Sequence, residues 1–132
     1  MSTSPSRKRN TKKTSSRLEE RIVLLLDDSK HVLKILSRHL ERRVDRIYSA
    51  TNPDQAEKIL KKNRITTLVC DHGTTSPSGS ELITKWRKRY NSISRALVLT
   101  GADVGGISAS PEVDKILSKA SALSEILAEI GR

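Results

Sequence analysis

Five short apolar segments alternate along this chain with segments of helical periodicity, and this alternation constrains the fold more than any other feature. The predicted strands are residues 21–26, 45–50, 66–71, 96–99 and 113–117. A helix between two consecutive strands returns the chain to the same end of the sheet, so the strands must run parallel. The alternation therefore predicts an α/β fold with a doubly wound, five-stranded parallel sheet.

Capping residues indicate where the first two helices begin. Ser29 is a suitable N-cap and precedes apolar residues at helical spacing. Asn52 and Pro53 supply an N-cap and a first-turn proline, and Gln55 stands at the capping-box position. Both helices are therefore expected to follow their strands after short turns.

The sequence predicts the third and last helices more clearly than the fourth. The third is expected to open at Gly79 and Ser80, and the last is amphipathic, with an inward face formed by Leu123, Ile126, Leu127 and Ile130. Residues 101–111 hold three Gly, one Pro and two Ser. The fourth helix is therefore predicted to be short or irregular.

The formal charge of +10 is unevenly distributed. Six cations and no acid fall within residues 1–17, which leaves +4 for residues 18–132. Residues 1–20 are predicted to form a disordered basic tail, because they cannot bury enough apolar surface to order, and residues 21–132 to form one domain. We favour a solvating role for the tail over a tether to an acidic partner or nucleic acid. One Trp, two Tyr and no Phe argue against nucleic-acid binding by base stacking.

Cysteine usage and apolar runs point to the cytoplasm. Cys70 is the only cysteine, so no intrachain disulfide can form, which suits a reducing compartment. The longest unbroken apolar run, residues 22–26, is too short for a signal-peptide core or a membrane span. We therefore expect a cytoplasmic protein without membrane insertion.

Polar residues with complementary chemistry end four of the predicted strands. They are Asp27 and Asp28, Asp71, Thr100 and Lys119. In a sheet of order 2-1-3-4-5, strands 1, 3, 4 and 5 line one crevice at the point where the strand order reverses. These side chains are therefore expected to be neighbours in space although they are far apart in sequence.

Clustered carboxylates repel one another, and a hard divalent cation such as Mg²⁺ relieves that repulsion. A metal, a lysine and a hydroxyl together can receive a tetrahedral dianion, and phosphoryl transfer requires little else. The remaining carboxylate can act as the nucleophile, as it does in aspartyl-phosphate chemistry. The constellation therefore predicts a magnesium-dependent phosphoryl acceptor.

Over residues 21–130 the chain resembles the receiver domains of response regulators in bacterial two-component signalling, which have a flavodoxin-like fold. The motifs that carry the resemblance are the acidic pair Asp27-Asp28, the acceptor Asp71, the hydroxyl residue Thr100 and the lysine Lys119. A glycine follows the acceptor eight positions later, at Gly79. Each motif alone is weak evidence, but all of them in order, each at a strand end, are specific.

The resemblance implies the roles of the metal ligands. Asp28, Asp71 and the backbone carbonyl of Gly73 would hold Mg²⁺, and Asp27 would assist through water. Asp71 would accept the phosphoryl group from a histidine kinase or a histidine phosphotransfer protein.

The resemblance also implies how the phosphoryl group is held and reported. Lys119 would pair with its oxygens, Thr100 would move to hydrogen-bond it, and Gly101 would leave room for that movement. The protein would then signal by contact with a downstream protein target. Slow self-dephosphorylation is the only catalysis expected, so we do not expect an enzyme.

Three positions depart from the family pattern. The usual proline four residues after the acceptor is Thr75, the usual cis proline after the lysine is Ala120, and the usual aromatic switch residue is Ile116. A cis bond before a residue other than proline costs about 2.5–4 kcal/mol, so a trans peptide is expected before Ala120. Ile116, Ala120 and the weak fourth helix motivate an alternative function, a receiver-like adaptor that works without phosphorylation.

Simpler interpretations exist for single residues. Asp27-Asp28 taken alone reads as a loop before a helix, and Lys119 alone as a solvated lysine. His72 is expected to be a rim residue, with donation to a phosphoryl oxygen as the alternative. We nevertheless favour a single-domain response regulator, because the residues converge as a set.

Overall fold

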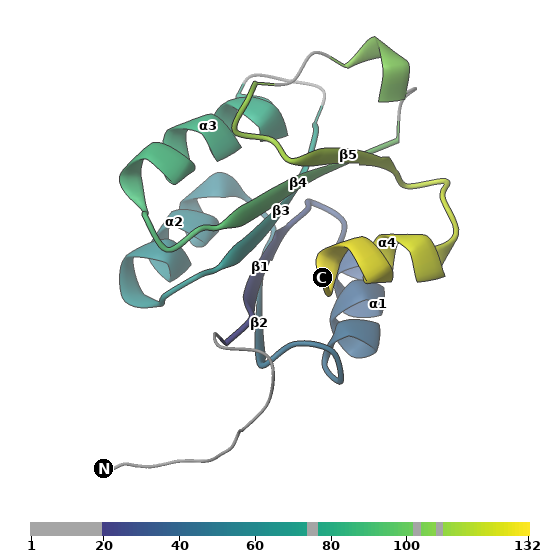
Figure 1. The fold of residues 1–132 in the computed structure, drawn as a ribbon, viewed down its shortest axis with the longest axis horizontal. Coiled ribbons are helices and arrows are strands. Elements are labelled where there is room, and N and C mark those ends of the chain that lie inside the picture. The colour runs from purple at the N-terminus through teal and green to yellow at the C-terminus, as the bar shows by residue number, and fades with distance from the viewer. Residues whose placement is uncertain (1–19, 74–76, 102–103, 108–109) are drawn as a thin grey trace.

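The computed structural model describes residues 20–73, 77–101, 104–107 and 110–132, which form a parallel sheet with helices on both faces (Figure 1). The strands are β1 (Ile22–Leu26), β2 (Arg46–Ala50), β3 (Thr67–Asp71), β4 (Arg95–Thr100) and β5 (Lys115–Ser118). The helices are α1 (Lys30–Leu40), α2 (Pro53–Lys62), α3 (Gly79–Arg89), the 3-10 turn η2 (Val104–Gly106) and α4 (Leu123–Ile130). The expected basic tail, apart from Glu20, and Thr75 lie outside the described residues.

The sheet has five strands in the order β2-β1-β3-β4-β5, and every neighbouring pair is parallel. The predicted fold class and strand order are therefore confirmed. Strand boundaries differ by one or two residues. β4 extends to Thr100 and β5 to Ser118, so the polar residues at these ends belong to the strands or follow them directly.

Capping accounts for the helix starts, with one difference from the sequence prediction. Ser29 caps α1 and Asn52 caps α2 as expected, each accepting a backbone N–H from the first turn. Helix α3 is capped by Ser78, which forms a full capping box with Glu81. The helix opens at Gly79 as expected, but the capping box formed by Ser78 and Glu81 is not among the sequence predictions.

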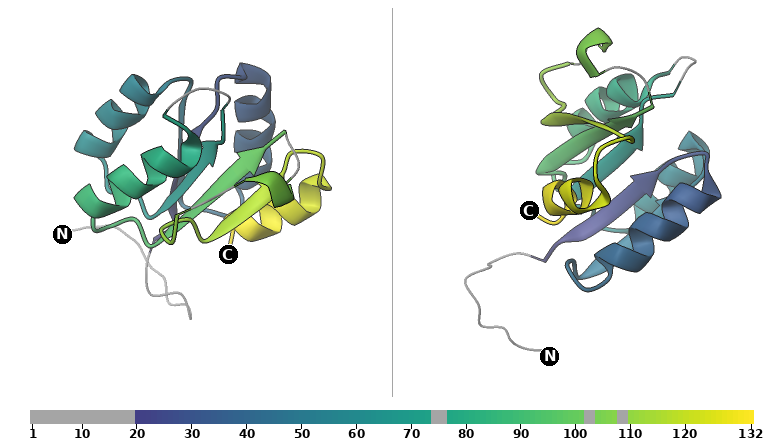
Figure 2. Two further views of the ribbon diagram at one scale, coloured as in Figure 1. Left: turned by 90° about the horizontal axis from the view of Figure 1, so that it is seen from above. Right: turned by 90° about the vertical axis from the view of Figure 1, so that its right-hand side faces the viewer.

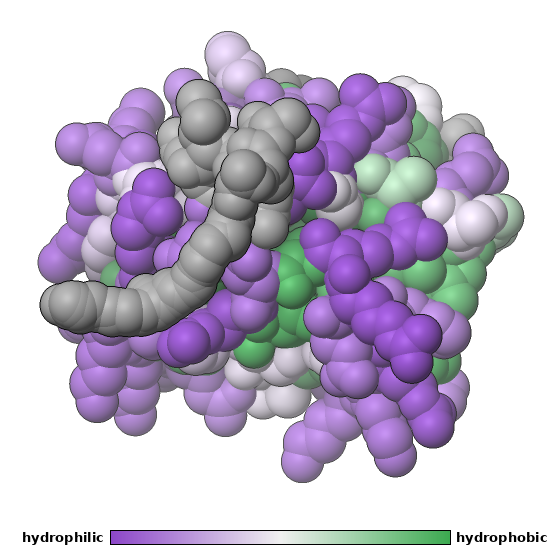
Figure 3. All heavy atoms as spheres, turned by 60° about the horizontal axis from the view of Figure 1, so that its bottom comes forward, coloured by the Kyte–Doolittle hydropathy of each residue, from purple (hydrophilic) through white to green (hydrophobic). Residues whose placement is uncertain are grey.

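The sheet separates two apolar cores. One lies against α2 and α3 and contains Trp86, which is 0% exposed; the other lies against α1 and α4 (Figure 2). Leu123, expected to face inward, is instead 36% exposed. On the face seen in Figure 3, hydrophobic residues reach the surface between hydrophilic ones.

Among its described residues, the connection between β4 and β5 carries the turn η2 and no α-helix, which confirms the expected irregular fourth helix. Hydrogen bonds and an ion pair attach this connection to α3. The Arg87 guanidinium donates to the Glu112 carbonyl at 2.7 Å and pairs with Asp114 at 2.9 Å. The Ser110 N–H donates to the Ser80 hydroxyl at 3.2 Å.

None of the helices in the described part of the chain has the length and apolar character needed to cross a membrane.

Candidate functional site

The acidic pair follows β1 at its carboxyl end. The Asp27 N–H donates to the Ala50 carbonyl at 3.1 Å, and one carboxylate oxygen accepts the Ser29 N–H at 2.9 Å. These bonds hold the Asp27 side chain in a nearly buried position, with 4% of its side chain exposed, whereas Asp28 is exposed. One acid is therefore fixed by the fold, and its neighbour faces solvent.

Asp71 is the last residue of β3, between β1 and β4. Its strand pairs Cys70 with Leu26 on one side and Asp71 with Leu99 on the other. Carboxylate oxygens of Asp27, Asp28 and Asp71 all lie within 4.8 Å of one another. Parallel pairing has thus gathered the three acids at one edge of the sheet, as the sequence analysis expected.

Lys119 reaches the acids from the end of β5. Its Nζ lies 2.8 Å from an Asp27 oxygen and 2.9 Å from an Asp71 oxygen. Burial alone would lower the pKa of Lys119, but the hydrogen bonds and negative charges of Asp27 and Asp71 outweigh burial and raise it above its ordinary value of 10.5. Lys119 is therefore a permanent cation at neutral pH, held against two carboxylates.

This raised pKa gives stability a dependence on pH in the alkaline range. A lysine whose pKa is raised by folding stabilises the native state fully below its unfolded value and loses that contribution as pH rises through the folded value. The difference in stability between the native chain and Lys119→Met should therefore be constant up to about pH 10 and shrink at higher pH. Urea unfolding of both proteins from about pH 8 to about pH 11.5 measures it. A difference that stays constant throughout would contradict the ion-pair assignment.

Thr100 lies at the same edge, fully within the fold. It is 2% exposed, and its carbonyl accepts the Lys119 N–H at 2.7 Å. Gly73 is exposed and has a φ of +76°, a conformation that residues with a side chain rarely adopt. A Cβ built at Gly101 meets no atom of the described residues within 4 Å, so there is open space at the residue that follows Thr100.

Gly79 makes the closest packing contact of the site. A Cβ built there would lie 2.4 Å from the Asp71 carbonyl oxygen and 3.2 Å from the His72 Cα. The Gly79 N–H also donates to the His72 carbonyl at 2.8 Å. Only glycine lets α3 begin this close to the backbone that carries Asp71.

Two features of the site carry little signal in the sequence. The Nδ1 atom of His72 is buried and has no hydrogen-bond partner among the described residues, although His72 was expected to be an ordinary rim residue. A groove of about 140 Å³ also adjoins Lys119, and it is lined by Val32, Ile35, Leu36, Leu99, Leu123 and Ile126. The exposure of Leu123 in this groove, at the start of α4, is not predicted by the helical pattern, which places Leu123 on the same face as Ile126.

The donor set fits a hard divalent cation. Three carboxylates converge and one ammonium group opposes them, so the cluster keeps an excess of negative charge at neutral pH. Oxygen ligands of this kind suit Mg²⁺ or Ca²⁺. The residues therefore fit the metal that the sequence analysis expected, and the same edge holds a lysine that could pair with an anion.

Comparisons with solved structures agree with this fold. No family model and no curated protein matches the sequence. Among solved structures, a Burkholderia pseudomallei response regulator with a phosphorylated aspartic acid, calcium ion and citrate is 28% identical with a TM-score of 0.70, over 84% of this chain and 66% of that one. The chain thus spans about two thirds of that regulator.

Two further structures are similar over most of their own length. The response regulator TrrA of Thermotoga maritima, in complex with Mg²⁺ and BeF, is 20% identical with a TM-score of 0.70, over 83% of this chain and 96% of that one. A CheY-like receiver domain from Methanospirillum hungatei is 18% identical with a TM-score of 0.68, over 85% of this chain and 91% of that one. The resemblance to response-regulator receiver domains is confirmed.

Proposed function

We propose that this chain, which has the fold of a receiver domain, is a single-domain response regulator that accepts a phosphoryl group on Asp71. The donor would be a histidine kinase or a histidine phosphotransfer protein, and the phosphorylated protein would signal by contact with a downstream protein. One observation carries the proposal: Lys119 bridges Asp27 and Asp71 at a sheet edge where three carboxylates converge. This arrangement supplies a nucleophile, a cation for the phosphoryl oxygens and ligands for a metal.

In this proposal, a carboxylate oxygen of Asp71 attacks phosphorus. The new P–O bond forms as the P–N bond to the donor imidazole breaks, and the imidazole keeps the bonding electrons and takes up a proton. Lys119 exchanges its contact with Asp71 for the phosphoryl oxygens, and Thr100 donates its hydroxyl to them. Positioning and charge stabilisation of this kind account for most of the catalysis in phosphoryl transfer.

The proposed metal ligands are Asp27, Asp28, Asp71 and the backbone carbonyl of Gly73. When bound, Mg²⁺ would neutralise charge that builds up on the phosphoryl oxygens. Asp27 already holds the Ser29 N–H and Lys119, so its share in metal binding would be through water. Asp28 is exposed and has its carboxylate free to turn toward the metal.

The test is phosphorylation by acetyl phosphate, followed by intact mass. With Mg²⁺ the chain should gain the mass of one phosphoryl group, and it should gain none without Mg²⁺ or after Asp71→Asn. Asp54→Asn is a matched control, because Asp54 lies in the first turn of α2 and is not one of the three converging carboxylates, so its removal should leave the adduct unchanged. An adduct that persists in Asp71→Asn, or no adduct with any small phosphoryl donor, would refute the proposal.

A second candidate is an adaptor that binds its partner without phosphorylation. Ile116 stands where the family has an aromatic switch residue, and it packs half-buried against the core on the α2–α3 side of the sheet. The 3-10 turn η2 between β4 and β5 also changes the surface that this connection presents to a partner. The adaptor predicts a partner affinity that Asp71→Asn leaves unchanged, whereas the response regulator predicts an affinity that depends on Asp71.

A further inference from the structure

Strand β2 forms one edge of the sheet, and its outer side offers backbone groups for pairing. The Asp27 N–H donates to the Ala50 carbonyl, and the Arg46 N–H donates to the carbonyl of Arg21, the residue before β1. Because backbone groups alternate in direction along a strand, those of Ile47 and Ser49 point away from β1. Each of these two residues has one N–H and one C=O, so the edge can take an added strand.

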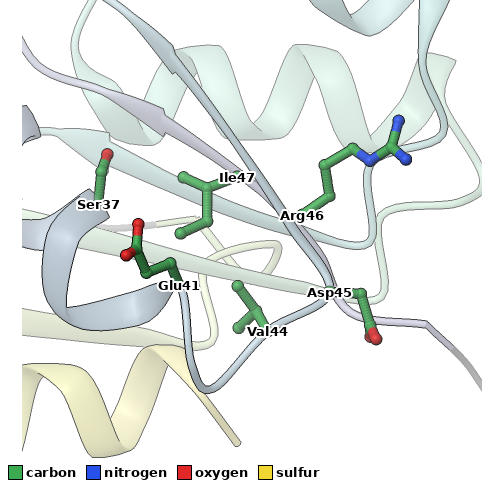
Figure 4. A pocket seen from close by; sticks show the side chains of 6 residues that line it. All are labelled: Ser37, Glu41, Val44, Asp45, Arg46 and Ile47. Atoms are coloured by element: carbon green, nitrogen blue, oxygen red, sulfur yellow. The ribbon is translucent and has the colours of Figure 1, made fainter.

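A pocket lies on each side of this edge. The pocket on the α1 side, of about 320 Å³, is formed by the end of α1, the following turn and β2, with Glu41 and Ile47 at its wall (Figure 4). The pocket on the α2 side, of about 240 Å³, is formed by β2, the start of β1 and the end of α2, with Tyr48, Ile22 and Lys62 at its wall. A strand added to β2 would send its side chains alternately toward one pocket and the other.

The two pockets have opposite charge character. Three cations, Arg46, Lys62 and Arg64, line the α2-side pocket, against one carboxylate from Glu20. The α1-side pocket is bordered by the carboxylates of Glu41 and Asp45 over apolar Val44 and Ile47. Arg46 also lines it, but its guanidinium points away from Glu41 and Ile47 (Figure 4) and donates to the Tyr48 hydroxyl on the α2 side. An added strand therefore fits best when its acidic side chains face the α2 side and small or apolar side chains face the α1 side.

We propose that the β2 edge binds an extended segment of a partner protein in which acidic residues alternate with small or apolar ones. Pairing with Ile47 and Ser49 supplies the backbone contacts, and the cationic pocket supplies selectivity for acid. A slip by one residue would turn the acids toward Glu41 and Asp45, so charge also fixes the register. The surface is separate from the acid cluster, and its binding does not rest on the proposed phosphorylation.

A peptide of sequence Glu-Thr-Glu-Val-Glu-Thr-Glu, capped at both ends, is the first probe. It should bind the full chain in a calorimetric titration, and Lys-Thr-Lys-Val-Lys-Thr-Lys should not. Two further peptides carry N-methyl groups on one or the other alternate set of residues, at unchanged charge. The backbone N–H groups of only one of these sets face β2, so only one of the two methylated peptides should lose binding. Equal binding by both, or no binding by the parent peptide, would overturn the proposal.

Two pairs of variants test the protein side. Ser49→Pro removes an outward N–H at an edge position that tolerates proline, and Ser49→Ala removes only the hydroxyl that meets Ser37 at 3.2 Å. The first should weaken peptide binding about fivefold and the second should not. Lys62→Glu should weaken it at least as much, whereas Lys88→Glu on α3 should not. If Ser49→Pro fails to fold, the comparison of peptide binding by Lys62→Glu and Lys88→Glu tests the proposal by itself.

A second copy of the chain is the competing occupant. A dimer of the chain alone that dissociates in Ser49→Pro would assign the edge to self-association and overturn the proposal. Monomeric behaviour in sedimentation, together with peptide binding that depends on Lys62, supports it.

Discussion

Gly79→Ala should lower the free energy of unfolding by about 3 kcal/mol, the upper range for overpacking in a core. The added Cβ would lie 2.4 Å from the Asp71 carbonyl oxygen, and the neighbouring atoms also belong to backbone, so no side chain can turn aside to make room. Either α3 or the end of β3 must shift. Urea unfolding followed by the fluorescence of Trp86 measures the loss.

The same shift should impair the acid cluster, because Asp71 is the last residue of β3. We expect Gly79→Ala to give less phosphoryl adduct than the native chain under conditions in which the variant is still folded. Gly101→Ala is the matched control, since a Cβ at Gly101 meets no atom within 4 Å. That variant should stay within about 0.5 kcal/mol of the native chain. Equal stability of the two variants would show that α3 can move away from Asp71 at no cost.

Lys119→Met should destabilise the chain by about 2 kcal/mol when divalent cations are absent. The replacement leaves the nearly buried Asp27 and the neighbouring Asp71 without the cation that now lies 2.8 Å and 2.9 Å from them. Breaking a fully buried pair costs about 3–5 kcal/mol, and the 28% exposure of the Lys119 side chain reduces that figure. Urea unfolding in a chelating buffer is the measurement.

Adding Mg²⁺ should recover much of this loss, because a divalent cation replaces the missing positive charge among the carboxylates. Mg²⁺ should therefore stabilise Lys119→Met more than it stabilises the native chain. Lys85→Met is the control, since Lys85 forms an exposed pair with Glu57 and should contribute less than about 1 kcal/mol. Equal effects of the two lysine replacements, or no difference in the response to Mg²⁺, would argue against an electrostatic role for Lys119.

The fold was predictable because its signal is periodic and repeated. Each apolar strand ends at a turn and is followed by a helical pattern, so alternation predicts the parallel sheet, and the resemblance to receiver domains implies its strand order. The meeting of Asp27, Asp71 and Lys119 followed from the same rule, because the carboxyl ends of parallel strands lie together. The sheet and the convergence of its strand ends both follow from short sequence patterns, which a single sequence is enough to show.

Features that depend on contacts between distant segments were not predictable. The attachment of the β4–β5 connection through Arg87 and Ser110 joins residues that are 25 and 30 positions apart, and no periodicity marks them. The exposure of Leu123 depends on how α4 packs against α1, and the sequence pattern of α4 alone does not encode that packing. The pockets beside β2 likewise arise only when the end of α1, the end of α2 and an edge strand come together.

The position of Trp86 determines what optical methods can observe in this molecule. It is the only tryptophan, it is fully buried, and its indole N–H donates to Glu57 at 3.0 Å. It lies about two helical turns along α3 from Gly79, beneath the layer formed by α2 and α3. Intrinsic emission therefore monitors the integrity of that layer, and chemistry at the carboxyl ends of the strands would need a reporter of its own, such as a fluorine label near Thr100.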